Sequence, residues 1–223
     1  MPAKPEHAAT VAAPKRIRRT QAERRAESER LILEAAIRTI GQKGSAQTTL
    51  AEVGIAAGYS RGLPAHVFGS KDNLILKAAQ SVMAMPPSHS LFAVKTTGGI
   101  AGMLQTVERW FLITKDRPDE IRGLLVLWSE GMPGNAASRS PELHSFLQTL
   151  DEAARLHFRE FLRDAMTRGE LRPDIDIDTQ ATLILGAIRG ILWQWIIMPD
   201  AFDLFEIGRS YVRELRRTLT TLE

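Results

Sequence analysis

The sequence predicts an all-α protein of about nine helices, with a small three-helix head followed by a larger helical bundle. Residues 48–71 contain the start and stop signals of two short helices joined by a tight turn, with a third helix beginning at once. Apolar residues recur at helical spacing between residues 100 and 111, which is typical of an amphipathic helix. Ser140-Pro141-Glu142 combines a cap, a proline at the first helical position and an acidic first turn, which together predict the start of a long helix.

The head begins with a helix expected over about residues 21–42. A capping box of Thr49 and Glu52 is expected to open the second helix, because each side chain satisfies a free backbone N–H at the helix start. Gly58 is expected to end it, since glycine readily adopts the left-handed conformation required just after a helix. Ser60 is then a suitable N-cap for the next helix.

That next helix, over about residues 61–68, is expected to read DNA. Helix-turn-helix proteins lay their second helix in the major groove, arginine makes the commonest specific contact to guanine, and helix N-termini bind phosphates. The alternative is a helical hairpin whose caps only stabilise it. The expected base contacts are Arg61, Gly62, Leu63 and Ala65, and the expected phosphate contacts are Thr48, Thr49, Ser60, His66 and Lys71.

Short motifs follow one another in a fixed order between residues 35 and 76. They are Ala35-Ala36, Gly44, Thr48-Thr49, Ala56-Ala57-Gly58, Ser60-Arg61-Gly62 and Phe68-Gly69-Ser70-Lys71. Together they resemble the DNA-binding domain of the TetR family of bacterial transcription regulators. A looser match at residues 169–174 resembles the connection before the last two helices in many members. Gly54 stands where the family usually has alanine, at a cost of about 0.5–1 kcal/mol of helix stability.

The resemblance implies a repressor that a small-molecule effector releases from a pseudo-palindromic DNA operator. It also implies a DNA-binding domain (20–80) and a helical ligand-binding domain that forms a homodimer (81–223). Residues 1–19 are rich in Ala, Pro and Lys and are expected to form a disordered basic arm. Two-fold symmetry suits pseudo-palindromic DNA. The dimer-interface candidates, all on the last two helices, are Ile188, Leu192, Trp195, Tyr211 and Leu215.

The pocket candidates are large or polar residues on inward faces, and plain core packing is the alternative for each. Residues 181–198 are apolar nearly all round, so this helix is expected to be buried on several sides. A buried cation there needs a carboxylate, a carbonyl group or an anionic ligand, which makes Arg189 the first candidate, with a structural ion pair as the alternative. The pocket candidates are Met103, Trp110, Trp128, Phe146, Leu185 and Arg189.

Charge is distributed unevenly along the chain. Residues 1–80 carry 13 Lys and Arg against 7 Asp and Glu, whereas residues 81–223 carry 16 against 19, for a net charge of +3 overall. The basic part contains the helix-turn-helix, as nucleic-acid binding requires. The arm would follow phosphates or enter the minor groove; a solvated tail and a membrane-surface helix are the alternatives. The candidate arm residues are Lys15, Arg16, Arg18 and Arg19.

Other functional classes lack their signatures. The chain has no cysteine and five scattered histidines, and it contains no His-Glu-x-x-His pair, phosphate-binding glycine motif or serine nucleophile elbow. We therefore expect no catalytic residues, no cofactor and no metal site. A helical adaptor that binds only protein is the alternative, although it would leave the basic head without a role. The N-terminus lacks a signal-peptide core, and no uncharged run reaches the roughly 18 apolar residues of a membrane span, so a cytoplasmic protein is expected.

Overall fold

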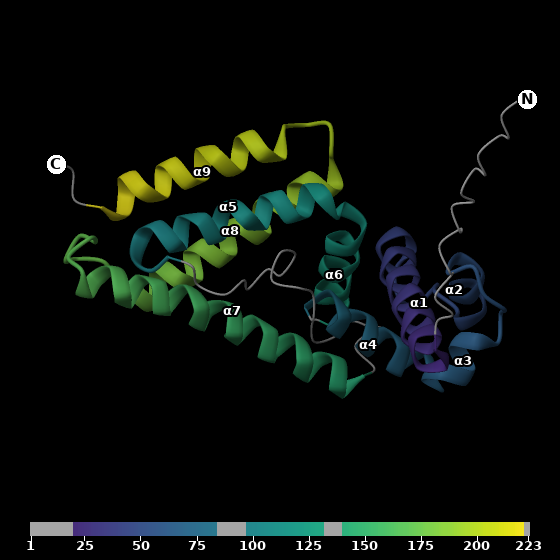
Figure 1. The fold of residues 1–223 in the computed structure, drawn as a ribbon. Helices are drawn as coiled ribbons and strands as arrows, with labels where there is room; N and C mark the ends of the chain where they lie inside the picture. The colour runs from purple at the N-terminus through teal and green to yellow at the C-terminus, as the bar shows by residue number, and fades with distance from the viewer. Residues whose placement is uncertain (1–19, 84–96, 132–139, 221–223) are drawn as a thin grey trace, which may run out of the picture.

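The structure is a computed structural model that describes residues 20–83, 97–131 and 140–220. Its described residues form nine α-helices and no strand, which confirms the all-α prediction (Figure 1). The helices are α1 (Gln21–Lys43), α2 (Leu50–Ala56), α3 (Leu63–Phe68), α4 (Lys71–Met83), α5 (Gly99–Asp116), α6 (Pro118–Glu130), α7 (Pro141–Thr167), α8 (Ile177–Ile197) and α9 (Leu204–Leu219).

The helices form a small head and an elongated body. In Figure 1, α1, α2 and α3 lie together at one end, and α5, α7, α8 and α9 run along the body. Helix α6 packs against α1, and α4 contacts both α1 and the body, so the expected domain boundary at residue 80 falls inside α4. One continuous cluster of buried apolar side chains extends from the head into the body.

Local signals set the helix ends of the head. Thr20 and Glu23 form a complete capping box at the start of α1. At α2 the Thr49 hydroxyl accepts a hydrogen bond from the Glu52 N–H at 3.3 Å, but the Glu52 carboxylate pairs with Lys43 Nζ at 2.5 Å. The expected capping box therefore forms only in part, and Glu52 instead ties α2 to α1.

Helix α3 starts two residues later than the sequence predicts. Its N-cap is Gly62, which makes no side-chain capping bond. A helix capped by Ser60 would need an N–H from residue 64 to reach the Ser60 carbonyl, and Pro64 has none. The Leu63 N–H bonds to that carbonyl instead, at 3.2 Å. Arg61 therefore lies in the turn before α3.

Gly54 explains the short connection between α2 and α3. A Cβ atom at this position would lie 2.5 Å from the Ser60 carbonyl oxygen and 3.1 Å from Pro64 Cδ. The turn can thus pack directly on the α2 backbone only because residue 54 has no side chain. The loss of helix propensity at Gly54 is the cost of this close contact.

We expect Gly54→Ala to lower the free energy of unfolding by about 1–3 kcal/mol, because the added methyl group overpacks the turn. Helix propensity alone predicts the opposite sign. Urea unfolding measures the change, with Gly62→Ala as the control, since a Cβ at Gly62 meets nothing within 4 Å. A Gly54→Ala protein at least as stable as the parent would contradict the packing argument.

Candidate DNA-binding surface and ligand cavity

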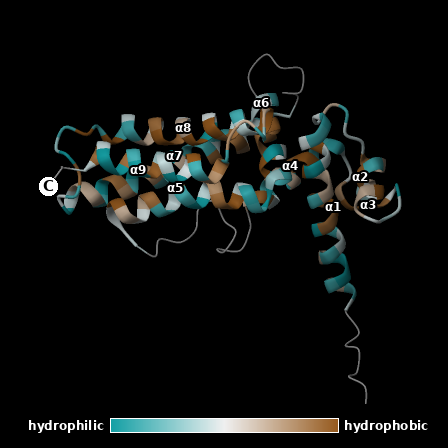
Figure 2. Ribbon diagram, turned by 90° about the horizontal axis from the view of Figure 1, so that it is seen from above, coloured by the Kyte–Doolittle hydropathy of each residue, from teal (hydrophilic) through white to brown (hydrophobic). Residues whose placement is uncertain are grey.

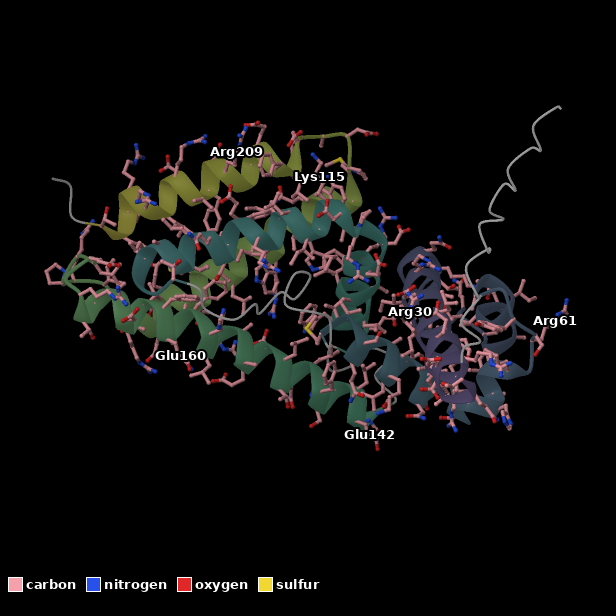
Figure 3. The ribbon with its side chains drawn as sticks, viewed as in Figure 1. Arg30, Arg61, Lys115, Glu142, Glu160 and Arg209 are labelled. Carbon is pink, nitrogen blue, oxygen red and sulfur yellow. The ribbon has the colours of Figure 1, made fainter. Side chains whose placement is uncertain are left out.

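The turn before α3 and the first turn of α3 form the outermost end of the head. Figure 3 shows the Arg61 side chain extending away from the rest of the molecule. Arg61, Gly62, Ala65 and His66 are exposed, and Leu63 is half-buried against the core. The expected base-contact residues therefore share one accessible surface that a DNA groove could cover.

The expected phosphate contacts divide into exposed and internally bonded residues. Thr49 and Ser60 are exposed. Thr48 is buried, and its hydroxyl donates to the Gly44 carbonyl at 2.8 Å, so its side chain faces the inside of the head and cannot meet a phosphate. Lys71 Nζ donates to the Ala46 carbonyl at 2.9 Å, which ties the start of α4 to the loop before α2.

A groove lies between the start of α1 and α3. Its volume is about 710 Å³, and it joins basic residues of α1 to the candidate reading helix. The sequence reasoning missed Tyr59, which lies here, because nothing local marks a residue that contacts a distant helix. The arm residues Lys15, Arg16, Arg18 and Arg19 lie outside the described residues. The groove is lined by Gln21, Arg24, Arg25, Glu27, Ser28, Tyr59, Leu63, His66 and Val67.

The body contains a cavity of about 560 Å³ between α6, α7 and α8. This volume lies within the usual range for small-molecule sites. Apolar and aromatic side chains line it together with two carboxylates and two arginines. The lining residues are Leu125, Trp128, Ser129, Gly131, His144, Leu147, Gln148, Asp151, Glu152, Arg155, Arg189 and Trp193.

Arg189 connects all three walls of this cavity. Its guanidinium carbon lies 4.6 Å from the centre of the Trp128 ring, in a cation–π contact. Its Nη1 donates to Asp151 Oδ1, so the ion pair expected as the alternative for Arg189 does form. The other oxygen of Asp151 pairs with Arg155 at 2.6 Å.

Helix α6 links this cavity to the head. A Cβ at Gly123 would lie 2.3 Å from the Ile37 carbonyl oxygen, so α6 and α1 are in direct backbone contact there. At the end of α6, Glu130 Oε1 accepts a hydrogen bond from the Ser45 N–H at 2.9 Å. Helix α6, which carries Trp128, is therefore joined to the head by a direct backbone contact and a hydrogen bond.

Two family models cover most of the described chain. Residues 32–78 match the bacterial regulatory proteins of the TetR family, and residues 101–219 match the C-terminal part of BetI-type transcriptional repressors. The chain belongs to the TetR family. It is a DNA-binding transcription regulator, and TetR proteins as a family are transcription factors.

Individual relatives agree with this assignment. The chain is 29% identical over 133 residues to the HTH-type transcriptional regulator BetI of Brucella canis, which covers 52% of this chain and 67% of that protein. For BetI of Agrobacterium fabrum the identity is 31% over 121 residues, covering 47% of this chain and 59% of that protein.

Solved structures share the fold. NalD, the secondary repressor of the MexAB-OprM multidrug efflux pump in Pseudomonas aeruginosa, has a TM-score of 0.69 at 18% identity and covers 89% of this chain and 98% of its own. A putative transcriptional regulator from Saccharomonospora viridis in complex with choline has a TM-score of 0.71 at 18% identity, with 88% and 100% covered. At these identities the likeness shows the TetR fold alone.

The predicted pocket residues are only partly brought together in this TetR-family body. Trp128 and Arg189 line the cavity. Met103, Trp110 and Leu185 are at most 2% exposed and belong to the core, as the core-packing alternative stated. Phe146 is half-buried against the core and is not among the lining residues. Sequence reasoning missed the α7 wall, although its lining residues recur at helical spacing.

The predicted dimer residues need a similar correction. Ile188, Leu192 and Leu215 are at most 5% exposed inside one protomer, because α8 and α9 use these faces for the protomer's own core. They offer no surface to a partner. Trp195 and Tyr211 are half-buried, and burial raises the pKa of Tyr211 to about 12.

A different face of α8 is open. Figure 2 shows hydrophobic residues all along this helix, and on its outer side Leu183 is 58% and Ile197 69% exposed. Gly186 and Gly190 lie between them at helical spacing, and a Cβ at either glycine would meet nothing within 4 Å. By length and composition alone, α8 is also the one helix among the described segments that could cross a membrane.

The described residues contain no group of three or more His, Cys, Asp or Glu side chains placed to hold a metal ion.

Proposed function

We propose that this TetR-family protein is a repressor that binds a pseudo-palindromic operator as a homodimer. The observation that carries the proposal is the exposed surface at the end of the head, where Arg61 extends outward beside the groove between α1 and α3. The two BetI relatives and the NalD structure carry names of transcriptional regulators or repressors. Residues 20–80 form the DNA-binding domain in this proposal, with 1–19 as a basic arm and 81–223 as the effector-binding and dimerisation domain.

The dimer is proposed to form through the outer face of α8. A second copy would cover Leu183 and Ile197, and the glycines between them would let the two α8 helices approach closely. Trp195 and Tyr211 would lie at the edge of this interface. In the cytoplasm a second copy of the chain would cover this apolar face, so the exposed leucine and isoleucine do not require a membrane. The two-fold axis of the dimer would place two heads on successive operator half-sites.

Effector control is proposed to act through the cavity between α6, α7 and α8. A small molecule in this cavity binds more tightly to the conformation in which the two heads are wrongly spaced for the operator. The ratio of its affinities for the two conformations sets how far the affinity for DNA falls. Contact with Trp128 displaces α6, which packs directly on α1 at Gly123 and bonds the head through Glu130. Two proteins that share this fold were solved in complex with different small molecules, one with choline and one with triclosan. The fold alone therefore does not determine the effector, and the side chains that line this cavity do.

The proposal is tested by operator binding with Arg61→Ala. We expect this change to cost about 1–3 kcal/mol of binding free energy and to relax preference at one base pair of each half-site, because an arginine contact to guanine supplies discrimination of that size. Electrophoretic or fluorescence titration against DNA from beside the gene, at several salt concentrations, measures both effects. Arg209→Ala is the control, since Arg209 lies on α9 far from the head (Figure 3). Equal loss in both variants, or no specific binding by the parent protein, would contradict the proposal.

A further inference from the structure

The hydrogen bonds around Arg189 leave two of its nitrogen atoms without an acceptor group in the part of the cavity that the structure describes. The guanidinium group always carries its charge in proteins and presents five N–H donors. Nη1 is used by Asp151, whereas Nε and Nη2 are buried and have no hydrogen-bond partner among the described residues. Nε and Nη2 form one edge of the guanidinium plane, and that edge matches the two oxygens of a carboxylate.

The carboxylates of the cavity are already occupied. Asp151 gives one oxygen to Arg189 and the other to Arg155. Glu152 Oε2 lies 3.2 Å from Arg155 Nη2, and its Oε1 lies 3.0 Å from Arg159 Nη1. The cavity wall therefore holds unused donors on Arg189 and no carboxylate oxygen without an arginine.

One of the two tryptophan rings that line the cavity already carries a cation. Quaternary ammonium groups bind over aromatic rings, with tryptophan the strongest partner. In this cavity the Arg189 guanidinium itself lies over the Trp128 ring, at 4.6 Å. A cationic ligand at this position would meet both an occupied ring and a neighbouring positive charge.

We propose that the effector of this regulator is an organic carboxylate with an apolar body, and that Arg189 binds its carboxylate group through Nε and Nη2. The proposal rests on the cavity being the effector site, as stated under the proposed function. The apolar body would lie against Leu125, Leu147 and Trp193, which line the same cavity. Because the free edge of Arg189 is buried, the incoming carboxylate shifts the guanidinium relative to Trp128. The shift of Arg189 on α8 displaces Trp128 on α6, and this displacement of α6 is the signal passed to the head.

The test compares three probes with the same phenylalkyl body on the full-length protein: 4-phenylbutyrate, its nearly isosteric uncharged amide, and the bulkier trimethylammonium analogue. Calorimetry and the fluorescence of Trp128 and Trp193 measure binding. We expect the carboxylate to bind about tenfold or more tightly than either analogue, because a charge-assisted bidentate contact is lost in both. Equal or tighter binding of the amide or of the cation, or no binding of the carboxylate at millimolar concentration, overturns the proposal.

Two variants separate recognition from folding. Arg189→Gln is expected to remove the preference for the carboxylate. The nearly isosteric Asp151→Asn is expected to tighten carboxylate binding several-fold, because it removes a competing negative charge from Arg189. A purely structural role of the Arg189–Asp151 pair predicts weaker binding in both, so opposite signs are the supporting result and equal signs the contrary one. Arg122→Gln, on α6 but outside the cavity lining, is the control and should leave the preference unchanged.

Operator binding is measured in the same ligand-free preparations. If the protein binds its operator specifically but shows no preference for the carboxylate probe, the proposed ligand class is wrong and the proposed function stands. A carboxylate preference without operator binding leaves the ligand class standing and overturns the proposed function.

Discussion

Leu183→Glu is expected to convert the dimer to a monomer and to weaken operator binding about a hundredfold or more, because two linked heads gain their affinity from simultaneous binding. Leu183 is 58% exposed in the protomer, so the substitution adds no strain to a single chain. In a dimer through α8 the glutamate would lie in an apolar interface without a partner, where a buried charge costs several kcal/mol. Analytical ultracentrifugation measures the oligomeric state, and operator titration measures the affinity.

The matched control is Leu156→Glu, which places the same charge at a leucine that is 45% exposed on α7. It should leave both the dimer and operator binding unchanged. A Leu183→Glu protein that remains dimeric would move the interface away from the outer face of α8.

The glycines beside Leu183 support the same interface by a separate argument. Glycine inside a helix costs roughly 0.5–1 kcal/mol relative to alanine, yet nothing in the protomer requires it at Gly186 or Gly190. The reason for glycine at these two positions therefore lies outside the protomer. The close approach of a second α8 helix in a dimer would require residues without a side chain there. Gly190→Ala should therefore stabilise the Leu183→Glu monomer while weakening the parent dimer.

The sequence predicted the head well because its signals are local. Caps, glycines and prolines act on residues within one turn, so the ends of α1, α4 and α7 could be placed closely. The start of α3 differs by two residues from the prediction, because Ser60 is a favourable cap by residue type but its carbonyl has no N–H donor at residue 64. Pro64 is the residue that lacks this N–H, so the signal for the later start is present in the sequence.

The faces of α8 could not be read in the same way. Residues 181–198 are apolar nearly all round, so the sequence has no periodicity that separates an inner from an outer side. Only the packed structure shows that Ile188 and Leu192 face the core and that Leu183 does not. The ion-pair partner of Arg189 could not be predicted from the sequence for a related reason. Asp151 lies 38 residues away on α7 and contacts Arg189 only through tertiary packing.

Gly123→Ala is expected to lower the free energy of unfolding by about 3 kcal/mol, near the upper end for an overpacked core position. The added Cβ would lie 2.3 Å from the Ile37 carbonyl oxygen and 2.8 Å from Ile37 Cγ1. Because the nearer atom belongs to the backbone of α1, no change of side-chain conformation relieves the contact, and Ile37→Val should not restore stability. Helices α1 and α6 must move apart, and urea unfolding measures the cost.

The same substitution tests whether α6 sets the position of the head. If the α1–α6 contact fixes the spacing of the heads, Gly123→Ala should weaken operator binding even under conditions in which all of the protein is folded. The loss of affinity would then not be explained by the lower free energy of unfolding. Arg122→Ala on the same helix removes only an ion pair with Asp119 at 3.8 Å, and should cost under about 1 kcal/mol without affecting DNA. Unchanged operator affinity in folded Gly123→Ala would mean that the effector signal reaches the head by a route other than this backbone contact, such as the Glu130–Ser45 hydrogen bond or the contacts of α4.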